Sequence, residues 1–388
     1  MLASPDTIFD VLDSAFSSVG EMYFQRFMRN TLTDKWMIAA DFVIGEPNAA
    51  HDVFAFTVFP HYQEFPAALA AIDAKLPRDL KNTKVLTDEM VAFLRDTRRF
   101  HFCFLVEKGR YKSTSIEMAR TAIAAAIEHV RRLETDGVEG GEGRRAGYIK
   151  AFKVLQEEAK AKRFNYRNFF DIKILSVLSA AIMLWIIRHG ECRQLALLPD
   201  RDKMTAGCKG IFRVVTELDH NGLCQRLGLQ PARSIGMPSQ EALEGPNLFY
   251  DALVRVPDYV AGVVSRLDYR EKVVTSDQVK HKELVERFLS DNPNLLIIQM
   301  SETIVSLGAS TIRLSSGFNP FPHVLPEELV DFIAAKARGY WSSPSPSYLR
   351  ELLGHTSDYP LVSKMLRSLL RGVAADNPGC VRVFTGRS

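Results

Sequence analysis

The chain has 388 residues, of which 46% are hydrophobic and 24% are charged, a balance that is typical of soluble globular proteins with one or two domains. Its formal net charge of +3 excludes a generally basic protein, so any surface that binds nucleic acid has to be a local patch. The five cysteines form no CxxC or Cys/His cluster, which argues against zinc and disulfides and favours reduced thiols in a cytoplasmic protein.

The N-terminal part of the chain predicts one helix and then two strands. Ser4-Pro5-Asp6 is typical of a helix start, and apolar residues follow it at helical spacing. We assign residues 1–33 to a helical extension that packs on the main body. Residues 34–41 and 53–59 are rich in apolar, aromatic and β-branched side chains, and this composition predicts strands.

Helices are expected at residues 65–76 and 87–95, and a third strand at 100–106. The Ala-rich residues 115–134 predict a long helix, and residues 136–147, with five glycines, predict a flexible loop. A Lys-rich helix is expected at 148–163. The apolar stretch 174–187 is shorter than the roughly 20 residues that span a bilayer, so we expect a buried core helix and no membrane contact.

A fourth strand is expected at residues 194–198 and a helix at 248–267. Beyond residue 268 the chain becomes turn-rich and then helical, and we assign 269–388 to an appended, mainly helical C-terminal module. The order of strands and helices between residues 34 and 268 predicts an α/β fold, with a mixed sheet flanked by helices. In open sheets of this kind, sites gather at the strand ends.

Three aspartates stand where such a fold could bring them together. Asp41 ends the first strand, Asp200 ends the fourth, with Asp202 as an alternative, and Asp258 lies on the late helix beside apolar residues. Each has an ordinary explanation as a turn or ion-pair residue; for Asp258 this would be a pair with Arg255, within a ladder that includes Asp251. Converging carboxylates would instead suit one or two Mg²⁺ or Mn²⁺ ions, which prefer oxygen ligands.

The same segments resemble a bacterial family of RNase H-like proteins of unknown function. Its members carry a first strand ending in Asp-Glu-Ser-Gly, a middle strand ending in Asp, and a helix of the type Ala-Asp-x-x-Ala-Gly. The chain resembles this pattern at Pro257-Asp258-Tyr259-Val260-Ala261-Gly262 and at residues 195–202, but Phe42 and Val43 replace the Glu and Ser after Asp41. The resemblance implies an RNase H-like domain over residues 34–268, with Asp41, Asp200 or Asp202, and Asp258 as metal ligands. Glu46, Glu89 and Asp251 are candidates to replace the missing acid.

Candidate nucleic-acid ligands are basic residues outside the acidic motifs. Lys81 and Lys84 could contact phosphates, and Lys162 and Arg163 begin a segment that interleaves basic and aromatic residues. A solvated basic face, or a helix whose aromatic residues enter the core, would give the same strings. No Walker-type phosphate loop, GxSxG or HExxH motif occurs, so NTPase, α/β-hydrolase and zincin functions lack support.

Two functions remain. The first is a Mg²⁺- or Mn²⁺-dependent nuclease for RNA or DNA, with Asp41, Asp200 and Asp258 as catalytic residues, as part of a bacterial defence system, for example against phage, or of a mobile-element system. The second is a catalytically inactive RNase H-like scaffold that binds nucleic acid or a protein partner. The C-terminal module could then serve for a protein partner or for homo-oligomer formation.

Overall fold

The computed structural model describes residues 4–31, 33–61, 65–132, 141–239, 242–243, 249–268, 273–275, 278–302, 307–312 and 314. The chain divides into two compact units, Met1–Ile312 and Arg313–Ser388. The boundary that we expected after residue 268 is therefore wrong, because strands beyond it belong to the main sheet. The expected helical C-terminal module lies outside the described residues from residue 315 onward.

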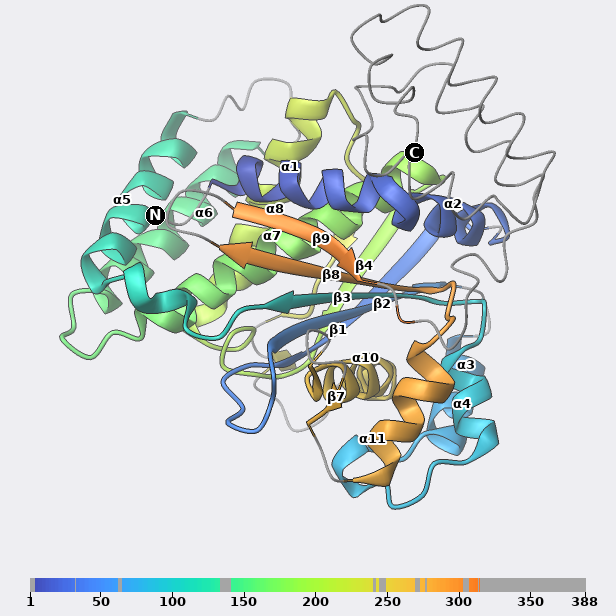
Figure 1. Cartoon of the computed structure of the whole chain (residues 1–388). Coiled ribbons are helices and arrows are strands. Elements are labelled where there is room, and N and C mark those ends of the chain that lie inside the picture. Colours follow the sequence, from blue (N-terminus) through green and yellow to red (C-terminus); the bar gives the residue numbers. More distant parts are fainter. Residues whose placement is uncertain are drawn as a thin grey trace, which may run out of the picture. The chain divides into compact units, whose positions relative to one another are not determined.

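A seven-stranded mixed sheet forms the centre of the first unit, in the order β5-β4-β1-β2-β3-β8-β9 (Figure 1). The strands are β1 (Lys35–Val43), β2 (Asp52–Pro60), β3 (Phe100–Val106), β4 (Gln194–Pro199), β5 (Ser234–Gly236), β8 (Leu295–Glu302) and β9 (Leu307–Ile312). β2 is antiparallel to both neighbours, and β9 is antiparallel to β8, whereas β4 is parallel to β1, β5 to β4, and β8 to β3. The predicted α/β class with a mixed sheet is confirmed.

One face of the sheet is covered by an apolar helical layer that contains α7, α8 and α1 (Figure 1). α7 (Tyr166–His189) is buried along almost its whole length, as its composition predicted. Trp185 on α7 stacks on Phe16 with ring centroids 4.1 Å apart and also lies 5.4 Å from Phe102 of β3. By length and composition α7 could cross a membrane, but 89% of its most apolar window is buried within the protein, as is typical of a core helix.

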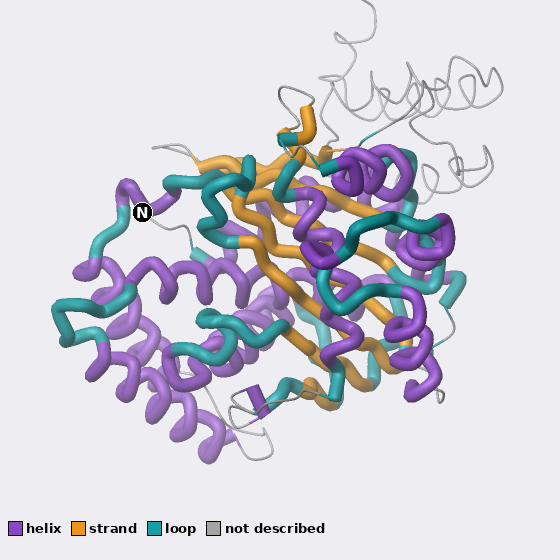
Figure 2. The backbone as a smooth tube through the Cα atoms, turned by 90° about the horizontal axis from the view of Figure 1, so that it is seen from below, coloured by secondary structure: helices purple, strands orange, loops and turns teal. Residues whose placement is uncertain are grey.

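The opposite face is covered mainly by α10 (Asp251–Val264), which packs across β1 and β2. α3 (Phe65–Lys75), α4 (Asp88–Leu94) and α11 (Val279–Leu284) lie on the same side. Figure 2, which is viewed from this side, shows the strands running behind these helices. The site described below lies between this helical layer and the ends of β1 and β4.

The remaining elements complete the two layers. They are α1 (Pro5–Ala15), α2 (Glu21–Arg29), α5 (Ile116–Arg132), α6 (Gly141–Glu158), α8 (Ile211–Leu227), the hairpin β6 (Leu267–Asp268) and β7 (Val273–Val274), and the short helical turns η1 (Phe16–Gly20), η2 (Leu80–Asn82), η3 (Arg110–Ser113), η4 (Cys208–Gly210) and η5 (Val285–Leu289). The N-terminal helices pack on α7 and β9, so the predicted extension is part of the main unit.

α6 corrects the prediction of a loop over residues 136–147. The helix begins at Gly141, so residues 141–147 are helical despite their glycines, and residues 136–140 lie outside the described residues. Each glycine inside a helix costs about 1 kcal/mol relative to alanine. Packing of α6 against α5 and α8, which buries Phe152 and Leu155, offsets this local cost.

Candidate functional site

Parallel pairing of β1 with β4 brings Asp41 and Asp200 to the same edge of the sheet. Ala40 is the register partner of Pro199, and the amide of Asp200 donates a hydrogen bond of 2.7 Å to the carbonyl oxygen of Ala40. The next residue along each chain segment is an aspartate: Asp41 within β1, and Asp200 directly after the last residue of β4. Because side chains alternate along strands, these two in-register residues point to the same face. Asp41 is buried, with 8% of its surface exposed.

α10 supplies the third aspartate from above the sheet. Asp258 follows Pro257 on the face of α10 that packs over β1, and its side chain forms a hydrogen bond with that of Asp41. The backbone N–H of Leu80 donates a 3.1 Å hydrogen bond to Oδ2 of Asp258. Two carboxyl groups can form a hydrogen bond only when they hold a proton between them.

The electrostatics of these residues follow from burial and from one another. Burial, followed by the charges of Asp258 and Asp200, raises the pKa of Asp41 well above its ordinary value. Burial raises the pKa of Asp258 to about 6, despite the hydrogen bond from Leu80. Burial also raises the pKa of Asp200. Among the described residues, no lysine or arginine forms an ion pair with Asp41 or Asp258, so their charge is not neutralised by the protein.

The segment opposite Asp258 is held in place from two sides. The buried ammonium of Lys280 donates hydrogen bonds to the carbonyl oxygens of Leu80, Lys81 and Thr83, at 2.8, 3.1 and 3.0 Å. Gly262, one turn after Asp258, leaves room for this segment, because a Cβ atom there would lie 2.5 Å from Cδ2 of Leu80. The glycine of the late helical motif is thus explained by close packing that fixes the donor to Asp258.

These residues line a pocket with a volume of about 580 Å³. Its charged lining comprises six carboxylates and five Lys or Arg side chains, with His281 in addition: Asp41, Glu46, Asp79, Asp200, Asp251, Asp258, Arg78, Lys81, Arg201, Arg255 and Arg266. The acids nearest the sheet are the buried ones. Lys81, by contrast, has 82% of its side chain exposed and forms an ion pair of 2.9 Å with Asp79.

The structure separates the sequence-predicted residues into those at the pocket and those elsewhere. Asp41, Asp200, Asp258 and Lys81 line it. Asp202 does not; its carboxylate accepts a hydrogen bond from the amide of Met204 and so stabilises the turn after β4. Three of the basic residues proposed to bind nucleic acid are exposed and are not part of the pocket lining: Lys84, Lys162 and Arg163.

Two of the three candidate replacement acids also reach the pocket. Glu46 and Asp251 line it and form ion pairs with Arg266 and Arg201, at 3.4 and 3.6 Å. Glu89 is outside, where it pairs with an exposed lysine of α3.

The ion-pair ladder that we considered along α10 is not formed at Arg255, the residue at its centre. Arg255 forms its ion pair with Asp73 of α3, at 2.6 Å, rather than with the acids of its own helix. Sequence reasoning also missed Arg78 and Arg266 as pocket residues. Arg201 could have been recognised as a pocket residue, because it directly follows Asp200, but Arg78 and Arg266 stand beside no recognisable motif.

The donor chemistry of the pocket fits a hard divalent cation. Asp41, Asp200 and Asp258 offer only carboxylate oxygens, which Mg²⁺ and Mn²⁺ prefer. Within the described part of the chain, no group of three or more His, Cys, Asp or Glu side chains is already gathered closely enough to hold a metal ion. Asp41 and Asp258 contact each other, so a cation would have to replace this contact between their side chains.

Comparisons with known proteins supply no relative. No protein-family model matches the chain, and no curated protein and no solved structure is significantly similar to it.

Proposed function

We propose that this protein is a metal-dependent nuclease with an RNase H-like core, which hydrolyses phosphodiester bonds of RNA or DNA with Mg²⁺ or Mn²⁺. The observation that carries the proposal is the meeting of Asp41, Asp200 and Asp258 in one pocket. They come from the first strand, the end of a later strand and a helix that packs over the sheet, and Asp41 and Asp258 have no basic partner among the described residues.

The order of the strands supports the RNase H-like part of the proposal. β1, β2 and β3 form consecutive antiparallel pairs, and β4 and β5 then add in parallel on the other side of β1. An acid on the first strand and one at the end of β4 become neighbours only in this arrangement. β8 and β9 extend the sheet beyond β3, away from the pocket strands.

The charges of the pocket support a polyanionic substrate that arrives with a cation. Burial and neighbouring acids raise the pKa of Asp41 and of Asp258, and this supports a site with more negative charge than the protein itself neutralises. A divalent ion would neutralise this charge, activate a water molecule and polarise the phosphate. Asp41, Asp200 and Asp258 would hold it, while Arg78, Lys81 and Arg201 at the same pocket would bind phosphate oxygens.

Substitution of Asp258 by Asn tests the proposal. Asn keeps the shape of the side chain and its acceptor for the Leu80 amide but removes the charge. We expect cleavage of RNA, DNA or hybrid oligonucleotides with Mg²⁺ or Mn²⁺ to fall by about 100-fold or more, as for loss of a main electrostatic group. Asp88→Asn is the matched control, because Asp88 is exposed and lies outside the pocket. Unchanged cleavage by Asp258→Asn would remove this residue from the mechanism.

A second pair of variants separates the two acids after β4. Asp200→Asn should reduce cleavage and Mn²⁺ binding, since Asp200 interacts with Asp41. Asp202→Asn should leave both within about twofold, since its carboxylate only stabilises a turn. The reverse result would show that the turn rearranges to present Asp202.

A catalytically silent scaffold is the alternative, and Phe42 and Val43 after Asp41 favour it. Calorimetric titration with Mn²⁺ distinguishes the two functions, because a scaffold without a cation site would release or absorb no heat at millimolar Mn²⁺. A role in a bacterial defence or mobile-element system, with a protein partner, is part of the proposal, and no contact among the described residues bears on it.

A further inference from the structure

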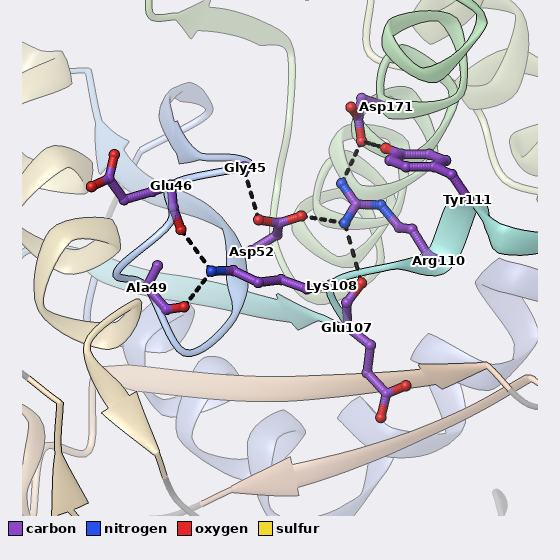
Figure 3. A network of polar contacts seen from close by, with 9 residues as sticks. All are labelled: Gly45, Glu46, Ala49, Asp52, Glu107, Lys108, Arg110, Tyr111 and Asp171. Carbon is purple, nitrogen blue, oxygen red and sulfur yellow. Dashed lines mark hydrogen bonds and ion pairs between the residues drawn. The ribbon is translucent and has the colours of Figure 1, made fainter.

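The loop between β1 and β2 contributes Glu46 to the pocket lining, and hydrogen bonds hold this loop in place. Lys108 donates hydrogen bonds from Nζ to the carbonyl oxygens of Glu46, at 2.6 Å, and of Ala49 (Figure 3). Gly45 has a φ of +70°, a conformation that suits glycine, and its amide donates a 2.8 Å hydrogen bond to Oδ1 of Asp52. The backbone on both sides of Glu46 is therefore fixed.

A buried ionic network lies behind this loop (Figure 3). Arg110 bridges Asp52 and Asp171, and the hydroxyl group of Tyr111 donates to Asp171; the side chains of the three charged residues are only 5–6% exposed. Burying such charges is costly, and apolar residues of similar size would stabilise the fold as well. The network fixes the carboxylate of Asp52, which accepts the hydrogen bond from the amide of Gly45.

The other end of the loop is joined to the helix that carries Asp258. The amide of Ala50 donates a 2.7 Å hydrogen bond to the carbonyl oxygen of Ser265, just after the end of α10. The next residue, Arg266, lines the pocket and pairs with Glu46 at 3.4 Å. Side-chain exposures of 22% for Arg266 and 44% for Glu46 make this pair weak, so an anion in the pocket can compete for the guanidinium.

Arg266 stands at a defined distance from the acids. Asp258 and Arg266 are eight residues apart on and just beyond α10, and Gly262 between them also lines the pocket. At 1.5 Å per residue, the two are separated by about 12 Å along the helix axis. This offset favours contact of Arg266 with a neighbouring phosphate over contact with the phosphate that a cation would hold at Asp258.

We propose that Arg266 binds a phosphate of the same nucleic-acid strand beyond the scissile one, and so makes the site selective for polynucleotides over small phosphodiesters. Glu46 holds the guanidinium in place before the substrate arrives, and Lys108 acts as a positioning residue for Glu46. This inference rests on the proposed nuclease function and adds to it a preference for polynucleotide substrates.

Arg266 is better suited to this role than Arg255 or Lys81. Arg255 is engaged by Asp73 at 2.6 Å and by the carbonyl oxygen of Leu76. Lys81 is 82% exposed, so a phosphate would have to order a mobile side chain. Arg266, in contrast, is partly buried, with 22% of its side chain exposed, and its backbone carbonyl oxygen accepts hydrogen bonds from the amide and hydroxyl groups of Thr275.

Two substrates of different size test the inference on the full chain with Mn²⁺. For Arg266→Met, we expect the KM of a 12-nucleotide substrate to rise about tenfold, the loss expected for one charge-assisted contact. Hydrolysis of bis(4-nitrophenyl) phosphate, which has no second phosphate, should stay within about twofold of the wild type. Arg213→Met is the matched control, because Arg213 also pairs with a glutamate but lies outside the pocket.

Binding of the same oligonucleotide in EDTA gives a second measurement that needs no turnover. The slope of log affinity against log salt should decrease by about one for Arg266→Met, as for the loss of one phosphate contact. Lys108→Met should raise the KM of the oligonucleotide in the wild-type background but not in the Arg266→Met background, because it acts only through that residue.

The possible failures can be told apart. Equal losses with both substrates, or an unchanged KM and salt slope for Arg266→Met, would overturn the role of Arg266 while leaving the nuclease intact. A wild-type protein that cleaves neither substrate with Mg²⁺ or Mn²⁺ would overturn the nuclease proposal itself, and the inference with it.

Discussion

Replacing Asp258 with Asn should stabilise the protein at pH 8 while it reduces function. The pKa of Asp258 is raised to about 6, against an ordinary value of 3.8, because the carboxyl group is buried and lies close to other acids. The folded protein therefore disfavours the charged carboxylate by at most about 3 kcal/mol. Asn removes this cost, keeps an acceptor for the Leu80 amide, and offers Asp41 a hydrogen-bond donor.

The pH dependence follows from the direction of the shift. Since the pKa is higher in the folded state, the folded state binds the proton more tightly, and the stability of the wild-type protein falls as the pH rises from about 4 to about 6. Above this range the cost is constant. The advantage of Asp258→Asn should thus be near zero below pH 4, grow between pH 4 and 6, and stay at its maximum at pH 8.

Denaturation of both proteins between pH 4 and 8, in EDTA, measures this difference. Asp96→Asn is a control of opposite sign, because hydrogen bonds from Arg98 and the charges of Arg98 and Arg99 lower the pKa of Asp96 although burial opposes them. It should destabilise the protein at pH 8. An Asp258→Asn variant that is less stable than the wild type at pH 8, or equally affected at pH 4, would refute the view that the charged carboxylate of Asp258 destabilises the folded protein.

Three further outcomes are expected. Lys280→Met should lower the free energy of unfolding by about 1–3 kcal/mol and weaken Mn²⁺ binding, because three carbonyl oxygens at residues 80–83 lose their donor; denaturant titration and calorimetry measure the two effects. Gly207→Ala should destabilise by about 1–3 kcal/mol, since a Cβ atom would overlap the carbonyl oxygen of Lys203, and should reduce cleavage, because the turn that follows Asp200 is displaced; thermal unfolding and cleavage assays would show both. Cys103 should not react with a thiol reagent until the protein unfolds, since full burial raises its pKa and blocks access; a labelling time course in increasing denaturant checks this.

The meeting of the three aspartates was predictable because it depends on simple rules. Parallel strands present their carboxyl ends at one edge of the sheet, and Asp41 and Asp200 each follow an apolar run. Asp258 stands among apolar residues that had to face the core, where a lone carboxylate is unfavourable. The choice between Asp200 and Asp202 depended on a local turn. The amide of Met204 donates a hydrogen bond to Asp202, so Asp202 stabilises this turn while Asp200 lines the pocket.

The basic side of the pocket was not predictable for a related reason. Arg78 and Arg266 reach the site through loops whose course depends on contacts far away in the sequence, such as those of Lys280 with residues 80–83 and of Lys108 with Glu46. The same holds for the domain boundary. β8 pairs with β3 across almost 200 residues, and no periodicity within its short apolar run reveals that partner.

The balance of forces at Asp41 and Asp258 also bears on the choice between a nuclease and a silent scaffold. A scaffold has no use for two neighbouring buried acids whose pKa values are raised, and an amide at either position would make the hydrogen bond without the electrostatic cost. A cation site, by contrast, needs this concentrated charge and is expected to be less stable than its neutral variant. If Mn²⁺ stabilises the wild-type protein at pH 8 and leaves Asp258→Asn unchanged, the energy lost by keeping these carboxylates is recovered on metal binding. If Mn²⁺ affects neither protein, the acids serve no cation and the nuclease proposal falls.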